Sequence, residues 1–362
     1  MRTAEPRNVE PQHVEVRCST TSAVHHSLFC GSTVHLLLFL LLGASFRAHA
    51  QPYFQQRVDH RIQVRLDDVR HTLHAYEEFD YHNNAPVALD TIWVHLWPNA
   101  YKDRSTALCK QQDAANEPDL HFAPAEDRGH IDSLDFRWNG TPLAWGLHPN
   151  QIDIGWIKLP VPLVPGASIT IGTPFHVKIP DGRFSRLGHS GQAYYITQWF
   201  PKPAVYDAQG WHAMPYLNQG EFYSEYGRYD VSITLPANYV VGATGVLQNE
   251  QERELMDRMA SGEWKYPEPM TDINTGKPLY NNFPASSTQM KTLRYVQDNV
   301  HDFAWFADKR FIVRKGSVTL PHSGRTVTTW ALSTPRNAKL WEDAVNYVNE
   351  SVRFYSTHVG DY

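Results

Sequence analysis

Short runs of alternating apolar and polar residues occupy most of the chain from Val64 onward, and Pro, Gly, Asn and Asp separate them. A period of two indicates a β-strand, because successive side chains point to opposite faces. The pattern predicts strands over residues 70–81, 91–96, 151–157, 159–164, 168–171, 175–180, 229–236, 240–247 and 292–297. Short strands at this spacing are typical of an antiparallel sandwich, so we expect a mainly β fold.

The strand pattern stops over residues 249–292, which are polar and contain several prolines. We interpret them as a long excursion from the sheet, with one short helix over residues 252–259. A hairpin is then expected from strands at 318–320 and 326–330, with Ser323-Gly324 as its turn.

One long helix is predicted over residues 336–359. Thr334 is a suitable N-cap, Pro335 suits the first helical position, and Gly360 suits the stop. Apolar residues recur every three or four positions, at Trp341, Val345, Val348, Val352, Tyr355 and Val359. An amphipathic helix needs a surface to pack against, so we expect a second domain to begin here.

Near the start of the chain, residues 34–42 form an apolar run, and Ala48-His49-Ala50 follow. This is the pattern of a secretory signal peptide cleaved after Ala50, and the run is short for a transmembrane helix. We therefore expect residues 1–50 to be a signal peptide and the protein to be exported to the periplasm or the extracellular space. No stable membrane span is expected after cleavage. The alternatives are a membrane anchor, an internal core helix, or a start codon further along the chain.

Composition narrows the classes of partner. The formal net charge is -5 and 42% of the residues are hydrophobic, so a globular chain is expected and nucleic acid is not an expected partner. Signal cleavage would remove Cys18 and Cys30, leaving Cys109 without an intrachain disulfide partner. Cys109 has no nucleophile motif around it, and we interpret it as a partly buried loop or helix thiol.

Four stretches, taken in order, resemble the gluzincin zinc aminopeptidases, the family of aminopeptidase N and leukotriene hydrolase, and especially their bacterial secreted members. They are residues 195–207, 229–236 with 240–245, 299–308 and 354–362. The resemblance implies a saddle-like antiparallel β-sandwich as N-terminal domain, over residues 51–311. It also implies that residues 312–362 are the first strands and helix of a thermolysin-like α+β peptidase domain.

The family's zinc site is absent from the 362 residues. It consists of H-E-x-x-H on one helix and a later Glu ligand, and no such spacing occurs here. The G-x-M-E-N-type motif and the downstream tyrosine are also missing. We interpret this as a truncation before the zinc motif. Zinc and a peptide substrate are therefore implied for full-length members, whereas this chain alone is expected to bind no zinc and to be inactive.

Gln198 is the candidate substrate-binding residue. Members of the family place a Gln or Glu of the β-domain near the free amine of the substrate, and Gln198 lies in the matching stretch. Its amide oxygen could accept a hydrogen bond from an ammonium group. A structural role at the domain junction is the alternative. Asp207 and Trp211 match positions that look architectural, and no catalytic residue is assigned.

Two other groups of residues have side chains suited to binding. The densest set of metal-ligand types is His71, His74, Glu78, Asp80 and His82, four of which share one face of a strand. Alternating polar residues are also typical of the solvated side of a sheet, which we favour. Trp138, Trp145, Trp156 and Trp211 suggest an alternative function, a non-enzymatic secreted module that binds peptide or carbohydrate, unless they fill the core.

Overall fold

The computed structural model describes residues 53–362 except 221, 267–270 and 280. The described residues form one compact unit. The predicted signal peptide, Cys18 and Cys30 lie outside the described residues, and export stays a prediction. None of the described helices is long and apolar enough to cross a membrane.

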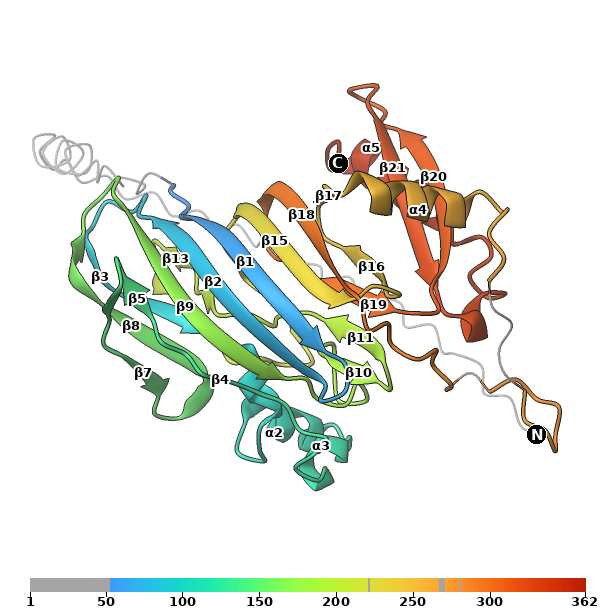
Figure 1. Ribbon diagram of the computed structural model, residues 1–362. Helices are drawn as coiled ribbons and strands as arrows, with labels where there is room; N and C mark the ends of the chain where they lie inside the picture. Colours follow the sequence, from blue (N-terminus) through green and yellow to red (C-terminus); the bar gives the residue numbers. More distant parts are fainter. Residues whose placement is uncertain (1–52, 221, 267–270, 280) are drawn as a thin grey trace, which may run out of the picture. The chain divides into compact units, whose positions relative to one another are not determined.

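Nine of the described strands belong to one large sheet, visible in Figure 1. Its order is β17-β18-β15-β1-β2-β9-β5-β6, and β4 pairs with β9. The bounds are β1 Arg57–Asp67, β2 Thr72–His82, β4 His130–Asp132, β5 Arg137–Trp138, β6 Thr141–Pro142, β9 Ser168–Lys178, β15 Gly227–Pro236, β17 Val246–Leu247 and β18 Met290–Val300. Burial alternates along β1 and β15, as the period of two predicts. The predicted mainly β fold is confirmed.

One central pair departs from the antiparallel expectation. β1 and β15 run parallel, with His60 opposite Tyr229 and Arg65 opposite Thr234. Alternation of apolar residues indicates which face of a strand is buried. It does not indicate whether the neighbouring strand runs parallel or antiparallel to it. β1 itself was missed, apart from its last residues.

A second sheet has the order β12-β3-β8-β7, with β3 Leu89–His95, β7 Trp145–His148, β8 Gln151–Leu163 and β12 Lys202–Pro203. The strands predicted at 151–157 and 159–164 are one strand. β8 contains two prolines, Pro160 and Pro162, which lack a backbone N–H. Both lie beyond the residues that pair with β7, so no hydrogen bond between β8 and β7 is lost.

A third sheet has the order β10-β11-β19-β16. Its strands are β10 Gly188–Ser190, β11 Ala193–Ile196, β16 Val240–Ala243 and β19 Trp305–Asp308, and β13 Tyr206–Asp207 pairs separately with β14 Gly210–Trp211. One core cluster includes residues of all three sheets, with Trp97, Trp199 and Trp305 fully buried in it. Three short helices escaped prediction, η1 Trp97–Tyr101, α2 Ala107–Ala114 and α3 Asp119–Phe122.

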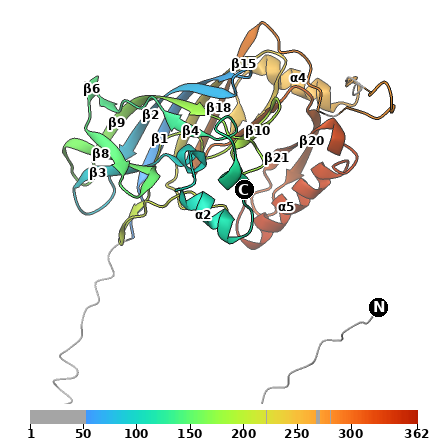
Figure 2. The same cartoon turned by 90° about the horizontal axis from the view of Figure 1, so that it is seen from below.

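The C-terminal part contains α4 Glu250–Ala260, β20 Ile312–Thr319, β21 Thr326–Ser333, η2 Pro335–Asn337 and α5 Ala344–His358. α5 lies against the β20–β21 hairpin (Figure 2). The predicted helix over 336–359 was eight residues too long at its start. Pro335 opens a single 3₁₀ turn instead, and the Ala338 carbonyl accepts a hydrogen bond from the Arg314 guanidinium at 3.2 Å.

Candidate functional site: an oriented amide at the end of a short sheet

Three of the four stretches that carry the family resemblance meet in the third sheet. β11 belongs to the first stretch, β16 to the second and β19 to the third. β19 lies in the middle, pairing with β11 on one side and with β16 on the other. Segments that are well separated in the sequence therefore form one local structure, and Gln198 follows the end of β11.

The backbone at Gln198 is unusual. Its φ is +48°, in the left-handed region, although Gln has a side chain that this region disfavours. The next residue, Trp199, is fully buried and donates from Nε1 to the Phe303 carbonyl at 3.1 Å. This anchor holds the loop against the start of β19. A strained residue held by its surroundings is a common feature of binding sites.

Gln198, Asp302 and Lys202 form a hydrogen-bonded chain, called the amide site below. Gln198 Nε2 donates to Asp302 Oδ2 at 3.2 Å, and Lys202 Nζ lies 3.1 Å from Asp302 Oδ1. Lys202 Nζ also donates to the His301 carbonyl at 2.5 Å. The Lys202 side chain is 4% exposed and that of Asp302 is 19% exposed, so this ion pair is largely shielded from water.

The carboxylate of Asp302 determines which end of the Gln198 amide faces it. An ionised carboxylate only accepts hydrogen bonds, so it selects the amide nitrogen and turns the oxygen away. That oxygen, Oε1, is buried and has no hydrogen-bond partner among the described residues. A buried acceptor without a partner costs free energy and is therefore a potential binding point.

A second buried polar pair, His60 and Glu77, lies close enough to Lys202 for the charge of Lys202 to act on both residues. His60 Nδ1 lies 2.6 Å from Glu77 Oε1, and both side chains are at most 2% exposed. The His60 ring stacks on Tyr229 at 4.6 Å between centroids. Burial raises the pKa of Glu77 well above its usual value, and burial and the charge of Lys202 lower the pKa of His60. The pair is therefore most stable as a neutral acid and a neutral imidazole.

Lys202 is the buried cation of this region. Burial lowers its pKa, and the ion pair with Asp302 opposes that shift. Removing either partner would leave a charge with little water around it, which is costly. The pair therefore fixes the position of Asp302 and, through it, the orientation of Gln198.

The amide site can bind but offers no visible means of hydrolysis. An amide oxygen beside a carboxylate suits an ammonium group, which only donates hydrogen bonds. Because Oε1 is covered, such a ligand requires a rotation of Gln198 or of a neighbouring side chain. The 362 residues contain no H-E-x-x-H spacing, so the residues present do not match the donor set that holds the catalytic zinc of the gluzincin aminopeptidases.

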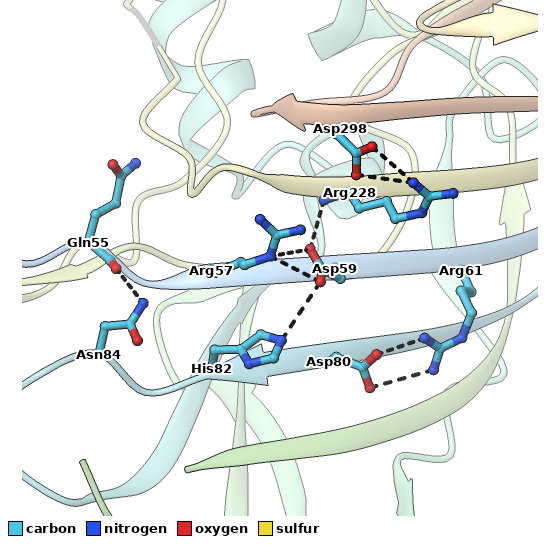
Figure 3. Close-up of polar contacts among 9 residues, drawn as sticks. All are labelled: Gln55, Arg57, Asp59, Arg61, Asp80, His82, Asn84, Arg228 and Asp298. Carbon is cyan, nitrogen blue, oxygen red and sulfur yellow. Dashed lines mark hydrogen bonds and ion pairs between the residues drawn. The ribbon is translucent and has the colours of Figure 1, made fainter. Parts of the chain in front are cut away.

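The residues on β2 with metal-ligand chemistry lie on the solvated face of the large sheet. Figure 3 shows Asp80 paired with Arg61 and His82 directed at Asp59, within a row of ion pairs across neighbouring strands. Arg61 also lies 3.5 Å from Glu78. His71 is elsewhere, in the turn before β2, with Nδ1 2.9 Å from the Tyr194 hydroxyl. The structure therefore does not gather the five residues.

The four tryptophans are all half-buried. Trp138, Trp145 and Trp211 pack against the core, and Trp156 lies across the β3–β8 pair from Trp93. They therefore do not form an open stacking platform. Trp211 lies in the β13–β14 hairpin with Asp207, whose carboxylate lies 2.8 Å from His212 Nε2.

Sequence reasoning missed Lys202, Asp302, His60 and Glu77. Lys202 and Asp302 do lie in stretches that carry the resemblance, which was a usable signal. Charged residues on strands are normally assigned to the solvated face, and only packing shows that these are buried.

A cavity of about 540 Å³ lies among Tyr239, Leu255, Met259 and Phe311, and neither Gln198 nor Asp302 lines it. Lys291 on its wall is paired with Glu252 at 2.5 Å. The cavity wall is mainly apolar, although Lys309 and Arg310 also line it, and the cavity is not part of the amide site.

No protein-family model and no curated protein sequence matches the chain. Solved structures with a similar chain path include the M1 zinc metallopeptidase of Deinococcus radiodurans, as a mutant, at 14% identity and a TM-score of 0.44 over 86% of this chain and 54% of that one. A two-domain M1 zinc metallopeptidase mutant bound to L-arginine is 13% identical, with a TM-score of 0.42 over 86% of this chain and 54% of that one. A two-domain M1 zinc metallopeptidase mutant bound to L-tryptophan is 14% identical, with a TM-score of 0.44 over 85% of this chain and 55% of that one. This chain spans about half the length of those proteins, and the likeness is too distant to identify its family.

Proposed function

We propose that this chain is the N-terminal portion of an exported zinc-dependent aminopeptidase, and that Gln198 binds the free amine of the peptide substrate. The observation that carries the proposal is the Gln198 amide, which Asp302 orients so that its oxygen is left without a partner. The convergence of three resembling stretches on the same short sheet supports it.

The physical basis is complementarity of charge and of hydrogen-bond type. A peptide's terminal ammonium has three donors and a positive charge, whereas the amide site offers an oxygen acceptor and a carboxylate behind it. Lys202 neutralises part of the carboxylate charge, so binding is expected to be weak and selective for the amine. Fixing one end of a substrate is useful only beside an activated water, which a following peptidase domain would supply.

The proposed organisation follows from the same reasoning. Residues 51–311 would be the N-terminal β-domain, and residues 312–362 would begin the peptidase domain. Taken alone, the 362-residue chain should release no chromophore from alanyl or leucyl anilides with zinc added, because it has no H-E-x-x-H motif. Turnover by this chain that a chelator abolishes would overturn that part of the proposal.

The binding role can be tested on the full chain with ¹⁵N-labelled glutamine side chains. A short alanine peptide with a free amine should shift the Gln198 side-chain signal in a saturable way, and the same peptide with an acetylated amine should not. Gln198→Leu should abolish the response, because leucine keeps similar bulk without an acceptor.

Gln297→Leu is the matched control, since Gln297 Nε2 donates to the Asp298 carbonyl on the exposed part of β18. That variant should bind as the unmodified chain does. Equal responses to both peptides, or no response to either, would favour a purely structural role for Gln198.

A further inference from the structure

Three side chains of metal-ligand type converge where α2 meets α3. Cys109 and Asp113 are four residues apart on α2 and therefore share one face of the helix, and His121 lies on α3. One ligand atom from each lies within 4.8 Å of the others. None of these residues belongs to the amide site.

The distances suit a small divalent ion. His121 Nδ1 lies 2.9 Å from Asp113 Oδ2, and Cys109 Sγ lies 3.9 Å from the same oxygen. Ligand atoms around tetrahedral zinc are about 3.3–3.6 Å apart, given bond lengths of roughly 2.0–2.3 Å. Small rotations of the Asp113 and His121 side chains would lengthen the distance between His121 Nδ1 and Asp113 Oδ2 and shorten that between Cys109 Sγ and Asp113 Oδ2.

The backbone that carries these ligands is held in place. Thr106 caps α2 by accepting from the Cys109 N–H at 3.3 Å. Arg104 Nε and one Arg128 nitrogen both donate to the His121 carbonyl, at 2.9 and 3.2 Å. Arg128 also donates to the Ala123 carbonyl, which ends α3. Fixed ligands lose little entropy on binding an ion.

Access differs among the three ligands. Cys109 is fully buried, whereas the side chains of Asp113 and His121 are 34% and 33% exposed. An ion can therefore arrive from solvent, contact sulfur on the protein side and keep a water on the open side. Three protein ligands and one water complete a tetrahedral zinc site.

We propose that Cys109 Sγ, Asp113 Oδ and His121 Nδ1 form a zinc site separate from the amide site. Sulfur and imidazole ligands select zinc over calcium or magnesium. The thiol proton leaves to solvent as the zinc–sulfur bond forms, and the resulting thiolate and carboxylate balance the two positive charges of the ion. The proposal differs from the sequence-based expectation that the chain binds no zinc, which rested on the missing H-E-x-x-H motif and stays a prediction until the binding is measured.

Cobalt is a suitable probe, because a tetrahedral cobalt–thiolate site absorbs light by charge transfer from sulfur. The full chain carrying Cys18→Ser and Cys30→Ser leaves Cys109 as its only thiol. It should take up one Co²⁺ with a charge-transfer band, and Zn²⁺ should displace the cobalt. Adding Cys109→Ser should remove the band, and His121→Gln or Asp113→Asn should weaken zinc binding at least tenfold.

His130→Gln is the matched control, since His130 is a half-buried histidine that pairs with Asp132 at 3.0 Å. It should bind zinc as the parent does. Zinc should also raise the Tm of the parent and of His130→Gln, but not that of His121→Gln, which reports binding without reference to catalysis. No one-to-one uptake, or uptake that is unchanged in both Cys109→Ser and His121→Gln, would overturn the proposal.

Discussion

Asp302 accepts a hydrogen bond from the Gln198 amide nitrogen at 3.2 Å, and its other oxygen lies 3.1 Å from Lys202 Nζ. One carboxylate therefore links the part-buried Gln198 amide to the buried ammonium group of Lys202. The orientation of Gln198 depends on an ion pair that lies almost entirely inside the protein.

The first prediction concerns this ion pair. Lys202→Met should lower the free energy of unfolding by about 2–3 kcal/mol, because Asp302 is left poorly solvated and unpaired. The double variant Lys202→Met/Asp302→Asn should recover part of that loss, which denaturant unfolding of the single and double variants would measure. The exposed pair Lys158–Asp90 serves as control and should show much weaker coupling. Strictly additive losses at Lys202 and Asp302 would contradict the prediction.

A second prediction concerns the left-handed backbone at Gln198, whose φ is +48°. Gln198→Ala and Gln198→Gly both remove the side chain and its bond to Asp302, but only glycine adopts this conformation without strain. The glycine variant should therefore be the more stable of the two by about 1 kcal/mol. Equal unfolding midpoints with equal m-values would show that the backbone stores no strain.

Gly227 provides a third prediction. A Cβ added there would overlap the backbone carbonyl of Val58, where β1 and β15 begin to pair. Gly227→Ala should therefore cost about 3 kcal/mol of stability or prevent folding. The control is Gly242→Ala in β16, where the added Cβ would meet Leu332 at an ordinary 3.5 Å. Thermal unfolding should show a much lower Tm for Gly227→Ala than for Gly242→Ala. Equal Tm values for the two variants would argue against the parallel pairing of β1 and β15.

A fourth prediction concerns pH. Burial raises the pKa of Asp153 to about 6, although its carboxylate accepts from the Tyr216 N–H at 2.7 Å. The folded state therefore keeps a proton that the unfolded state has already lost, so this residue makes stability fall as pH rises from about 4 to about 6. The loss is on the order of 3 kcal/mol and is constant above that window.

Asp153→Asn should remove this contribution. The difference in unfolding free energy between variant and parent should change across the window and be flat above pH 7. Asp343→Asn, at an exposed position before α5, is the control and should leave the pH profile of the parent unchanged. If the difference in unfolding free energy between Asp153→Asn and the parent stayed constant from pH 4 to pH 7, the interpretation of Asp153 as a buried acid would be wrong.

The fifth prediction is export. Amino-terminal sequencing of the protein recovered from an exported fraction should begin at or near Gln51, because the apolar run 34–42 and Ala48-His49-Ala50 have the pattern of a signal peptide. An uncleaved chain that begins at Met1 and stays in the cytoplasm would contradict it.

Local pattern predicted the strands well because burial of one face imposes a period of two on the sequence. β9, β15 and β18 each contain a predicted segment, β2 overlaps one, and α4 contains its predicted helix. The start of α5 was misplaced because Thr334 and Pro335 suit a 3₁₀ turn as well as an α-helix. A capping pattern indicates that a turn begins without saying how far it continues.

By itself, the sequence determined the mainly β class and the positions of most of the long strands, since these depend on residue type and local order, whereas the candidate Gln198 came from the family resemblance. Only the tertiary structure decided that β1 and β15 are parallel, that Lys202 and Asp302 form a shielded pair, and that Cys109, Asp113 and His121 converge. These facts depend on which distant segments become neighbours, and strand direction, burial of a charge and ligand geometry are properties of that packing rather than of any one segment.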